Sequence, residues 1–413
     1  MTVDPEPCSV EQHLARVLGG VSPLPVEATP LLGALGLVCA EDVVAPIALP
    51  PFDNSAMDGY AVRQADVADA SEATPVVLPV VGEIGAGQAN LRELSPGAAA
   101  KIMTGAPIPA GADAVVPYEW TDRGADKVTI TEAPEVGQHV RPRGDDVTEG
   151  ERLLRAGTVV GPRHVGLLAA VGHATVPVRR RPRVAILSTG SELREPGTKV
   201  GHDSIFDGNS YLLAAAVTRA GGVPHRVGIV RDKPGAFLAA LDAQLDDVDV
   251  VVTSGGVSQG DYDVVKEALR DRGVWFGPVR MQPGKPQGFG VLAGPDGGVP
   301  IVTLPGNPVS SYLSFDVFVL PALRTMMGQE PVSRPTVEAR LTEAIGSPPD
   351  RRQFRRGIAA VDAGGRHVAP VGGPGSHLVG DLAAANCLIV VPEDVTRLEV
   401  GATVPVLMLD EEF

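Results

Sequence analysis

Between residues 182 and 330, short apolar runs alternate with longer stretches in which apolar residues recur every three or four positions. The short runs predict buried strands, and the periodic stretches predict helices. Strands that alternate with helices of 10 to 20 residues indicate a doubly wound α/β domain with a mostly parallel sheet. The predicted strands are 184–190, 223–230, 248–256, 274–279, 288–292 and 299–304, and the predicted helices are 209–222, 234–245, 261–273 and 308–327.

The pattern on either side of this region is different. Ser9 and Gln12 form a capping box for a helix ending at Leu18, because Gly19 and Gly20 follow. Residues 37–45 and 75–133 consist of short apolar segments separated by glycine-rich turns, which predicts strands. A helix from Pro162 to Val171 with proline at its first position is expected. From Pro331 onward the chain again shows the strand pattern.

These changes of pattern divide the chain into four predicted domains. They are a discontinuous mixed α/β linker domain (1–52 and 140–181), a small β domain inserted into it (53–139), the α/β domain (182–330) and a C-terminal β domain (331–413). The length of 413 residues is sufficient for each domain to have a hydrophobic core. The fold class is therefore multidomain α/β plus β.

Charge excludes some functions. With 35 Lys and Arg against 50 Asp and Glu, the net charge is −15, which disfavours general binding of nucleic acid or anionic lipid. The basic run RRRPR at 179–183 is interpreted as a solvated junction, since Pro182 interrupts it and a strand follows. A local positive pocket for a small anionic substrate remains compatible with the acidic total.

The chain is predicted to be cytoplasmic. Its start, MTVDPEPCSVEQ, lacks the basic and apolar regions of a signal peptide, and no apolar run reaches the length of a membrane span. The three cysteines, Cys8, Cys39 and Cys387, are far apart, which suits a reducing compartment and argues against a disulfide framework or a thiolate zinc site.

Three loops follow predicted parallel strands at the edge where doubly wound sheets bind ligands. They are STGSEL (188–193), TSGGVSQGDYD (253–263) and LPGNPVSS (304–311). Glycine, serine and asparagine are common in any strand-to-helix turn, so each loop alone could be structural. Together the loops favour a ligand that carries phosphate, although neither a P-loop nor a dinucleotide fingerprint is present. Asn307 could cap the helix that follows it.

Two further loops carry charged groups. Lys285, in PGKP, is a positive charge suited to an oxyanion, or else an ordinary solvated lysine. Asp53 and Asp58 lie in PPFDNSAMDGYAV (50–62), where oxygen ligands suit Mg²⁺ and where the same residues also suit a simple turn. Thr104, Asp145 and Asp146 add oxygen donors elsewhere. A hard cation held by carboxylates is the one metal that this sequence favours.

Taken together and in order, these motifs resemble one family. FDNSAMDGYAV, KIMTGAPIP, RGDD, ILSTGSEL, SGGVSQGDYDVVK, PGKP and LPGNPVSS occur in the order seen in molybdopterin molybdenumtransferases, the bacterial MoeA and gephyrin E-domain family. RRQFRRG and GSHLVGDLAAANCLIVVP resemble that family's last domain. The resemblance spans residues 9 to 407 and is specific, because DNSAMDGYA and LPGNPVS occur in one chain.

The resemblance implies a function. Members insert molybdenum from molybdate into adenylated molybdopterin and release AMP, with a divalent cation such as Mg²⁺. It implies a homodimer whose cleft is lined partly by a domain of the partner chain, a central domain of the molybdopterin-binding type and a C-terminal β-barrel-like domain. Transient contact with the pterin adenylyltransferase or with apo-molybdoenzymes is also expected.

The resemblance assigns residues to the site by motif. The catalytic residues would be Asp58, Thr104, Asp146, Glu192 and Asp263, with Asp58, Glu192 and Asp263 as metal ligands. The pterin phosphates would bind Ser188, Thr189, Gly190, Gly255, Gly256, Ser258, Pro305, Gly306 and Asn307. Molybdate would bind Lys285, Pro286, Arg351, Arg356 and Ser376.

The chain departs from the family pattern at two positions. The family usually has K-P-G-K-P, and here Gln282 replaces the first lysine. The usual R-x-E-F-x-R has Gln353 in place of glutamate. The loss of one positive charge bears on how the oxyanion site binds molybdate.

Two other functions are compatible with the same chain. One is a scaffold, since gephyrin-type E domains also anchor partners, although a scaffold does not need the oxygen donors Asp58, Thr104, Glu192 and Asp263. The other is a pterin adenylyltransferase, which has a similar α/β unit but lacks the additional β domains and the DNSAMDGYA loop.

Overall fold

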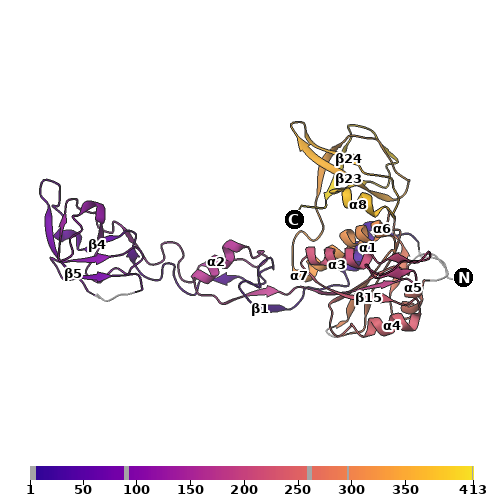
Figure 1. Cartoon of the computed structure of the whole chain (residues 1–413), viewed down its shortest axis with the longest axis horizontal. Coiled ribbons are helices and arrows are strands. Elements are labelled where there is room, and N and C mark those ends of the chain that lie inside the picture. Colours follow the sequence, from indigo (N-terminus) through magenta and orange to yellow (C-terminus); the bar gives the residue numbers. More distant parts are fainter. Residues whose placement is uncertain (1–5, 88–92, 258–262, 295–296, 412) are drawn as a thin grey trace. The chain divides into compact units, whose positions relative to one another are not determined.

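The structure is a computed structural model that describes residues 6–87, 93–257, 263–294, 297–411 and 413. The chain forms two compact units. The first unit comprises Met1–Glu27, Gly36–Ala40 and Pro177–Phe413, and the second comprises Ala28–Leu35 and Glu41–Val176. Figure 1 labels their helices and strands.

A six-stranded sheet is the centre of the first unit. Its order is β15 (Val223–Val230), β12 (Arg183–Thr189), β16 (Val250–Ser254), β20 (Val299–Leu304), β19 (Pro286–Leu292) and β17 (Trp275–Pro278). The first four strands run parallel, whereas β19 pairs antiparallel with β20 and with β17. The predicted doubly wound domain with a mostly parallel sheet is confirmed.

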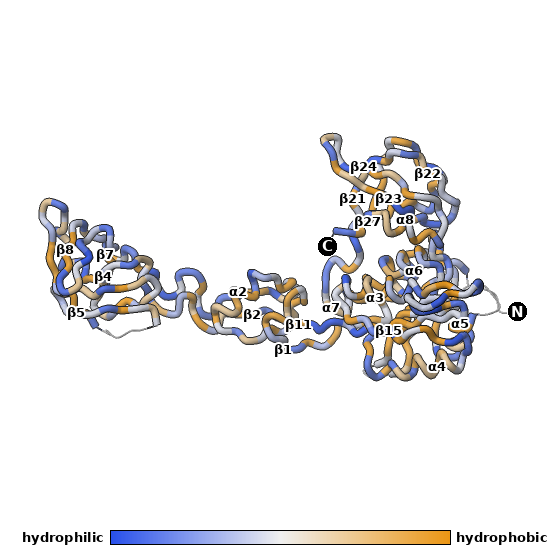
Figure 2. Tube along the Cα trace, viewed as in Figure 1, coloured by the Kyte–Doolittle hydropathy of each residue, from blue (hydrophilic) through white to orange (hydrophobic). Residues whose placement is uncertain are grey.

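Helices cover both faces of this sheet because side chains alternate along each strand. Val184 and Ile186 of β12 pack on one face with Leu213 of α3, whereas Ala185 and Leu187 pack on the other with Phe237 of α4. In Figure 2 the hydrophobic colour follows the strands of this sheet. The helices of the domain are α1 (Val10–Leu18), α3 (Asn209–Arg219), α4 (Pro234–Asp242), α5 (Val264–Leu269), α6 (Pro308–Ser314) and α7 (Leu320–Met327).

Two predicted helices differ from their expected form. The helix expected over 308–327 is interrupted at Phe315–Val319, where α6 passes through a π-helical turn into α7. Pro321 explains the break, because proline has no N–H and its ring collides with the carbonyl four residues earlier. The helix expected over 261–273 covers only Val264–Leu269, and positions 261 and 262 lie outside the described residues.

The start of the chain folds as its sequence predicts. Ser9 caps α1, its hydroxyl accepts a hydrogen bond from the Gln12 N–H, and the Gln12 side chain accepts one from the Ser9 N–H. Val10 and Val17 of α1 are buried in the core of the α/β domain. The short strands of this domain are β13 (Leu193–Arg194), β14 (Ile205–Phe206) and β18 (Met281–Gln282).

The C-terminal domain is a closed five-stranded barrel. Its strands pair in the order β23, β24, β21, β27 and β25, and β25 returns to β23. Closure leaves none of these five strands as a free edge, and the enclosed core includes Val368, Ile389 and Val406. The elements are β21 (Thr336–Leu341), β22 (Ile345–Gly346), β23 (Arg352–Asp362), β24 (Gly365–Pro370), α8 (Val379–Ala384), β25 (Cys387–Val391), β26 (Arg397–Leu398) and β27 (Thr403–Met408). The expected barrel-like domain is confirmed; the helix α8 was not predicted.

The second unit contains a five-stranded sheet in the order β7, β4, β6, β5, β8, built on buried Tyr60, Val116 and Ile130. Its strands are β4 (Gly59–Val62), β5 (Val76–Ile84), β6 (Ala99–Ile102), β7 (Ala114–Pro117) and β8 (Lys127–Ile130). Its other elements are β2 (Val43–Val44), β3 (Asn54–Ser55), two 3-10 turns (Gln64–Asp66 and Tyr118–Trp120), β9 (Val140–Arg141), β10 (Arg152–Leu154) and α2 (Pro162–Ala170). The predicted helix starting at Pro162 and the strand-rich stretch 75–133 are confirmed.

Strands β1 (Val26–Pro30) and β11 (Thr175–Arg179) cross the sequence borders of the two units. The finer division into four domains stays a prediction. None of the helices in the described part of the chain is long and apolar enough to span a membrane.

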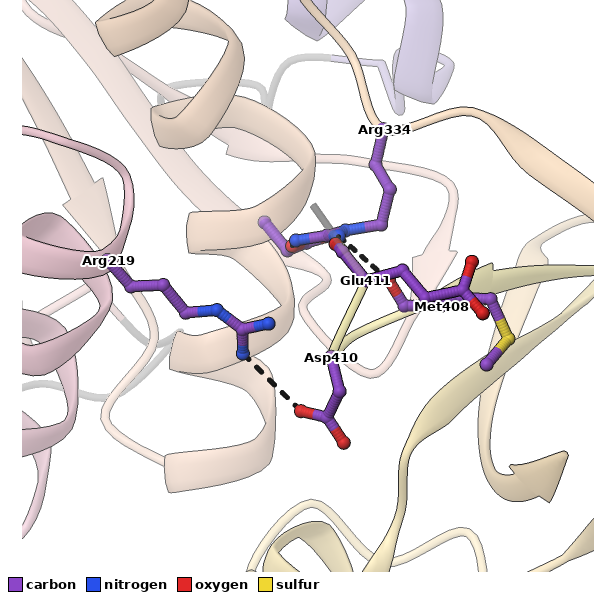
Figure 3. A network of polar contacts seen from close by, with 6 residues as sticks. Arg219, Arg334, Met408, Asp410 and Glu411 are labelled. Carbon is purple, nitrogen blue, oxygen red and sulfur yellow. Dashed lines mark hydrogen bonds and ion pairs between the residues drawn. The ribbon is translucent and has the colours of Figure 1, made fainter. Parts of the chain in front are cut away.

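A buried ion pair joins the barrel to the α/β domain. Arg334, in the linker before β21, contacts the Asp316 carboxylate at 3.1 Å, and both side chains are at most 10% exposed. The same guanidinium donates to the carbonyls of Met408 (2.7 Å) and Glu411 (3.1 Å). Figure 3 shows Arg334 against this final segment, with Arg219 beside Asp410. Burial raises the pKa of the Asp316 carboxyl, and Arg334 opposes that rise.

Removing Arg334 should therefore destabilise the first unit. Arg334→Met leaves the Asp316 carboxylate buried without its cation, which typically costs about 3–5 kcal/mol of unfolding free energy. Urea denaturation at neutral pH measures the loss. Arg334→Met combined with Asp316→Leu should recover much of it, because the unpaired charge is then absent. The control is Arg397→Met, which breaks an exposed pair with Glu399; equal midpoints for Arg334→Met and Arg397→Met would contradict the role of the buried pair.

Candidate functional site

The first unit contains a cavity of about 970 Å³ at the carboxyl ends of β12, β16 and β20. This is the edge at which parallel α/β sheets bind ligands. The three predicted loops and residues of the C-terminal domain line it. The sequence-predicted residues on its wall are Ser188, Thr189, Gly190, Glu192, Gly255, Gly256, Asp263, Lys285, Pro286, Pro305, Gly306, Asn307, Arg351 and Ser376.

Two glycines let the three loops approach one another. Gly255 has φ +93°, and a Cβ there would lie 3.0 Å from the Thr189 carbonyl oxygen of the first loop. A Cβ on Gly306 of the third loop would lie 3.5 Å from the Gly255 Cα. Larger residues at Gly255 would strain the backbone and push the first and second loops apart. The two glycines therefore let the three loops pack against one another.

Hydrogen bonds fix the loops in this arrangement. The Asn209 side-chain amide, at the start of α3, donates to the Ser254 hydroxyl (2.8 Å) and to the Gly306 carbonyl (2.7 Å). The Gly255 N–H donates to the Leu304 carbonyl at 3.1 Å. Asn209 thus connects the second and third loops. The prediction did not include Asn209, although the sequence Asp-Gly-Asn before a helix is a signal for such a position.

Four acidic residues line the cavity: Glu192 and Asp263, which were predicted, and Asp207 and Asp232, which were not. Asp232, Glu192 and Asp263 follow β15, β12 and β16, which are neighbours in the sheet. Asp263 lies directly before α5. Asp232 accepts a hydrogen bond from the Ser191 N–H at 2.6 Å, which connects the loop after β15 to the loop after β12. Asp232 follows β15, which is also a parallel strand. The search for loops after parallel strands could therefore have found it.

Asp207 is the most buried of these acids, at 1% exposed. Its Oδ1 accepts hydrogen bonds from the Ser188 hydroxyl (3.3 Å) and the Ser210 N–H (3.0 Å). Its Oδ2 is buried and has no hydrogen-bond partner. A buried carboxylate oxygen without a hydrogen-bond partner is costly, so this oxygen needs a further partner that the described residues do not supply.

Two basic residues, Lys285 and Arg351, also line the cavity. Lys285 directly precedes β19, which lies on the other side of β20 from β16, β12 and β15 in the sheet. The Lys285 carbonyl accepts from the Val279 N–H at 2.7 Å. Buried Gln287 donates to the Gly284 carbonyl and to the Ser314 hydroxyl, both at 2.6 Å. The backbone on both sides of Lys285 is therefore fixed while its ammonium group is exposed, an arrangement suited to an anion.

The start of α6 corrects one prediction. Asn307 is the N-cap residue, but its side chain makes no capping hydrogen bond and instead donates to the Ser376 hydroxyl at 2.9 Å. The Val309 N–H, in the first turn of α6, donates to the Ser376 carbonyl at 3.0 Å. Ser376 of the C-terminal domain occupies these groups because it packs directly on the first turn. The loop 372–378 thereby becomes part of the cavity wall.

Arg356, predicted to bind molybdate, does not line the cavity. Its side chain is buried, donates to the carbonyls of Gly373 and Gly375, and lies 3.8 Å from the Asp381 carboxylate. In this structure Arg356 holds the loop that carries Ser376. Ser258, predicted to bind the pterin phosphates, lies outside the described residues.

Asp58 and Thr104 form a pair in the second unit. One Asp58 carboxylate oxygen accepts hydrogen bonds from the Thr104 N–H (2.7 Å) and from its hydroxyl (2.8 Å). These bonds hold the pKa of the Asp58 carboxyl below its usual value. Gly59, the first residue of β4, allows the close approach of β7, because a Cβ there would lie 2.0 Å from the Val116 carbonyl oxygen. The motifs that carry Asp58 and Thr104 therefore lie side by side in the second unit.

Asp146 is also in the second unit, exposed, with its N–H bonded to the Leu49 carbonyl at 3.0 Å. Asp58, Thr104 and Asp146 do not belong to the residues that line the cavity of the first unit. Over the described residues, no group of three or more His, Cys, Asp or Glu side chains is placed to hold a metal ion.

Apolar and imidazole groups complete the wall and were not predicted. Ile205 and Phe206 of β14 line the cavity although 58% and 46% exposed. Exposed apolar side chains beside a cavity suit a planar ring of a ligand. His377 follows Ser376 and also lines the cavity. The sequence has no clear signal for Phe206, because its exposure depends on the short pairing of β13 with β14.

The whole arrangement can bind an extended anion that has both a phosphate part and an oxyanion part. Carboxylates at one part of the wall could share a cation with phosphates, and Lys285 and Arg351 could neutralise an oxyanion. Breaking a phosphoanhydride between these parts is compatible with such a division of charge.

Family models match three segments of the chain. The "MoeA N-terminal region (domain I and II)" matches residues 8–172, the "Probable molybdopterin binding domain" matches 185–325, and the "MoeA C-terminal region (domain IV)" matches 338–409. Together the three matches cover most of the sequence.

Similar proteins extend over nearly the full length. Molybdopterin molybdenumtransferase 2 of Mycobacterium tuberculosis is 47% identical over 408 residues, covering 96% of this chain and 98% of the relative. Molybdopterin molybdenumtransferase 1 of the same organism is 40% identical over 423 residues, covering 97% and 99%. The crystal structure of a molybdopterin biosynthesis MoeA protein from Pyrococcus horikoshii has a TM-score of 0.83 and 34% identity, covering 98% of this chain and 100% of that chain.

The pairing of Asp58 with Thr104 predicts a measurable titration. Thr104→Val removes one of the two donors, so the pKa of Asp58 should rise toward its usual value while staying below it. The interaction stabilises the fold above the usual carboxyl pKa and is lost as pH falls through the lowered value. Carboxyl ¹³C chemical shifts in an Asp-labelled sample measure both states.

Asp122 is the internal control, because its carboxylate accepts from the Thr129 and Gly124 N–H groups and its pKa is also lowered. Its titration should be the same in wild type and in Thr104→Val. An unchanged Asp58 titration in the variant would contradict the pairing.

Proposed function

The chain belongs to the MoeA family of molybdopterin molybdenumtransferases, and from this premise we propose that the cavity of its first unit is where molybdenum is inserted into molybdopterin. The reaction takes adenylated molybdopterin and molybdate and releases AMP, and it belongs to the biosynthesis of the molybdenum cofactor. The family resemblance of the sequence is confirmed.

This proposal rests on the acidic and basic side chains that line the cavity. Glu192, Asp207, Asp232 and Asp263 lie on the same wall as Lys285 and Arg351. An adenylated pterin has a phosphoanhydride, and molybdate is a tetrahedral oxyanion. A wall with separate acidic and basic parts can hold a cation beside the phosphates and an oxyanion beside the dithiolene that receives the metal.

We propose that the phosphates bind at Ser188–Gly190, Gly255–Gly256, Ser258 and Pro305–Asn307, and that Lys285, Pro286, Arg351 and Ser376 bind molybdate. Arg356 acts on this site through the loop it holds, since its guanidinium donates to two carbonyls of that loop. Ser376 connects the two parts, because it bonds to Asn307 of the phosphate loop.

We propose that the reaction depends on Mg²⁺. The donor set fits this ion, which binds one or two protein carboxylates and takes its remaining ligands from substrate phosphates and water. Glu192 and Asp263 would hold it, with Asp58 as a further ligand. Asp207 and Asp232 are additional donors on the wall, and Asp207 has an unpaired buried oxygen. When bound, the ion would neutralise charge that develops on the phosphates.

We propose that the chain acts as a homodimer. The family resemblance implies that a domain of a second copy lines the cleft, and Asp58, Thr104 and Asp146 would act from that copy. The lowered pKa of Asp58 supports a role as an ionised carboxylate at every physiological pH. A cytoplasmic location and transient contact with the pterin adenylyltransferase or with apo-molybdoenzymes complete the proposal; the thiol state of the three cysteines supports the location.

Asp263→Asn should lower the rate of AMP release by about 10²-fold or more while the protein stays folded, because it removes a carboxylate that would hold the cation at the reacting phosphates. Asp58→Asn should do the same. The assay contains purified protein, adenylated molybdopterin and Mg²⁺, with and without molybdate. AMP release and activation of an apo-molybdoenzyme are followed together.

Asp271→Asn is the matched control, since this exposed aspartate follows α5 and lies away from the cavity wall. It should retain the wild-type rate. Wild-type rates in both Asp58→Asn and Asp263→Asn would overturn the assignment of these residues. AMP release that never depends on molybdate would overturn the proposed reaction.

A further inference from the structure

The two glutamines that depart from the K-P-G-K-P and R-x-E-F-x-R motifs lie next to each other in the fold. Gln282 of β18 and Gln353 of β23 are register partners in a parallel pair. Register partners on parallel strands project their side chains to the same face of the sheet. Strand β18 lies in the chain between β17 and β19 of the α/β sheet but pairs with β23 of the barrel, so this pair lies where the two sheets are joined.

The two glutamines have different surroundings. Gln282 is partly buried and lines the cavity together with Lys285 and Arg351. Gln353 is 1% exposed, and its side-chain oxygen is buried without a hydrogen-bond partner. The pair thus consists of an amide that faces the cavity and an adjacent amide enclosed in the protein.

Burial constrains the charges that the two positions can carry. A carboxylate at position 353 would be enclosed, and it would be strongly destabilised without a cation close to it. The neighbouring Arg352 does not supply that cation, because its guanidinium is paired with Glu11 and Glu393. Its side chain also alternates to the opposite face of the strand. Arg355, two residues along the same face, donates to the Gly372 carbonyl. On β18, residue 282 is the register partner of residue 353, so a cation at position 282 would lie beside a charge at position 353.

The converse holds for position 282. A lysine there would add a third cation to the wall that already has Lys285 and Arg351, and the neutral Gln353 would offer it no counter-charge. Two neutral amides leave no unpaired charge at these positions, and neither does a lysine at 282 with a glutamate at 353. One charged residue beside one neutral residue leaves a charge without its partner. The identity of one residue is coupled to that of the other.

We propose that Gln282 and Gln353 form a coupled neutral pair that sets the charge of the oxyanion end of the cavity. A tetrahedral oxyanion then meets Lys285, Arg351 and a neutral amide donor from Gln282. Recognition relies on hydrogen bonding at this position instead of a further positive charge. This inference rests on the proposed function, because it specifies how the molybdate end of the same cavity selects its ligand.

The test is a double-mutant cycle on the full-length protein. The variants are Gln282→Lys, Gln353→Glu and their combination, each characterised by its thermal unfolding midpoint and by calorimetric titration with sodium molybdate. Gln353→Glu alone should lower the midpoint by several degrees, and adding Gln282→Lys should recover most of the loss. Additive midpoints, or a double variant no more stable than Gln353→Glu alone, would overturn the coupling.

Molybdate affinity tests the other half of the proposal. Gln282→Lys should bind molybdate about tenfold more tightly than wild type, with a steeper dependence on salt, because it adds a cation beside the oxyanion. Gln282→Met, which keeps the size and removes the donor, should bind several-fold more weakly. Gln244→Lys, on the loop after α4, is the charge-matched control and should leave the affinity unchanged. Equal affinities in wild type, Gln282→Lys and Gln282→Met would overturn the role of the amide.

The midpoint and titration results are independent of catalysis. If the wild type and the two Gln282 variants bind molybdate in this order of affinity but the wild type releases no AMP, the proposed function is refuted. The role of the paired glutamines is then still supported. If Gln353→Glu does not fold and the double variant does, the coupling is supported most directly. If neither folds, the two single variants at Gln282 decide the proposal by their affinities.

Discussion

The parallel register of β12, β16 and β20 is the constraint on which the rest of the first unit depends. Val184 pairs with Val250 and Val251 pairs with Ile301, so the three strands end together and their loops emerge at one edge. Backbone hydrogen bonding fixes this register, and alternating burial against two layers of helices prevents it from slipping by one residue. The cavity exists because three loops that are far apart in sequence must emerge side by side.

The carboxyl edge alone does not make the cavity. The barrel contributes Ser376 and Arg351, and its position depends on the pairing of β18 with β23 and on the buried contact of Arg334 with Asp316. The π-helical turn between α6 and α7 bears Asp316. The irregularity in the long helix is therefore part of how the two domains join, and the helix that starts at the phosphate loops also carries the ion pair at the domain boundary.

Local signals in the sequence were sufficient for most elements of the fold. The capping box at Ser9 predicted α1, and the alternation of strands and helices predicted the α/β domain, because these patterns report short-range geometry and burial. The π-helical turn required knowing how Pro321 affects the preceding turn. The closure of the barrel by β23 with β25 was accessible only through the family resemblance, since strand pairing over long separations leaves little trace in one sequence.

The sequence predicted the candidate site to the same extent as the fold, and again from local patterns. Most of the loop residues after parallel strands were predicted, with the exception of Asp232, whereas Asp207 and Asn209 were missed because they follow β14, a short strand outside the main sheet. The capping role expected of Asn307 was wrong because Ser376, from another domain, competes for its side chain. Contacts between domains decide which polar groups remain available to a ligand. Such contacts cannot be predicted from the residues of one loop, because they depend on segments that are distant in the sequence. The pairing of Gln282 with Gln353 has the same origin: two separate departures from a motif become one feature only when β18 lies beside β23.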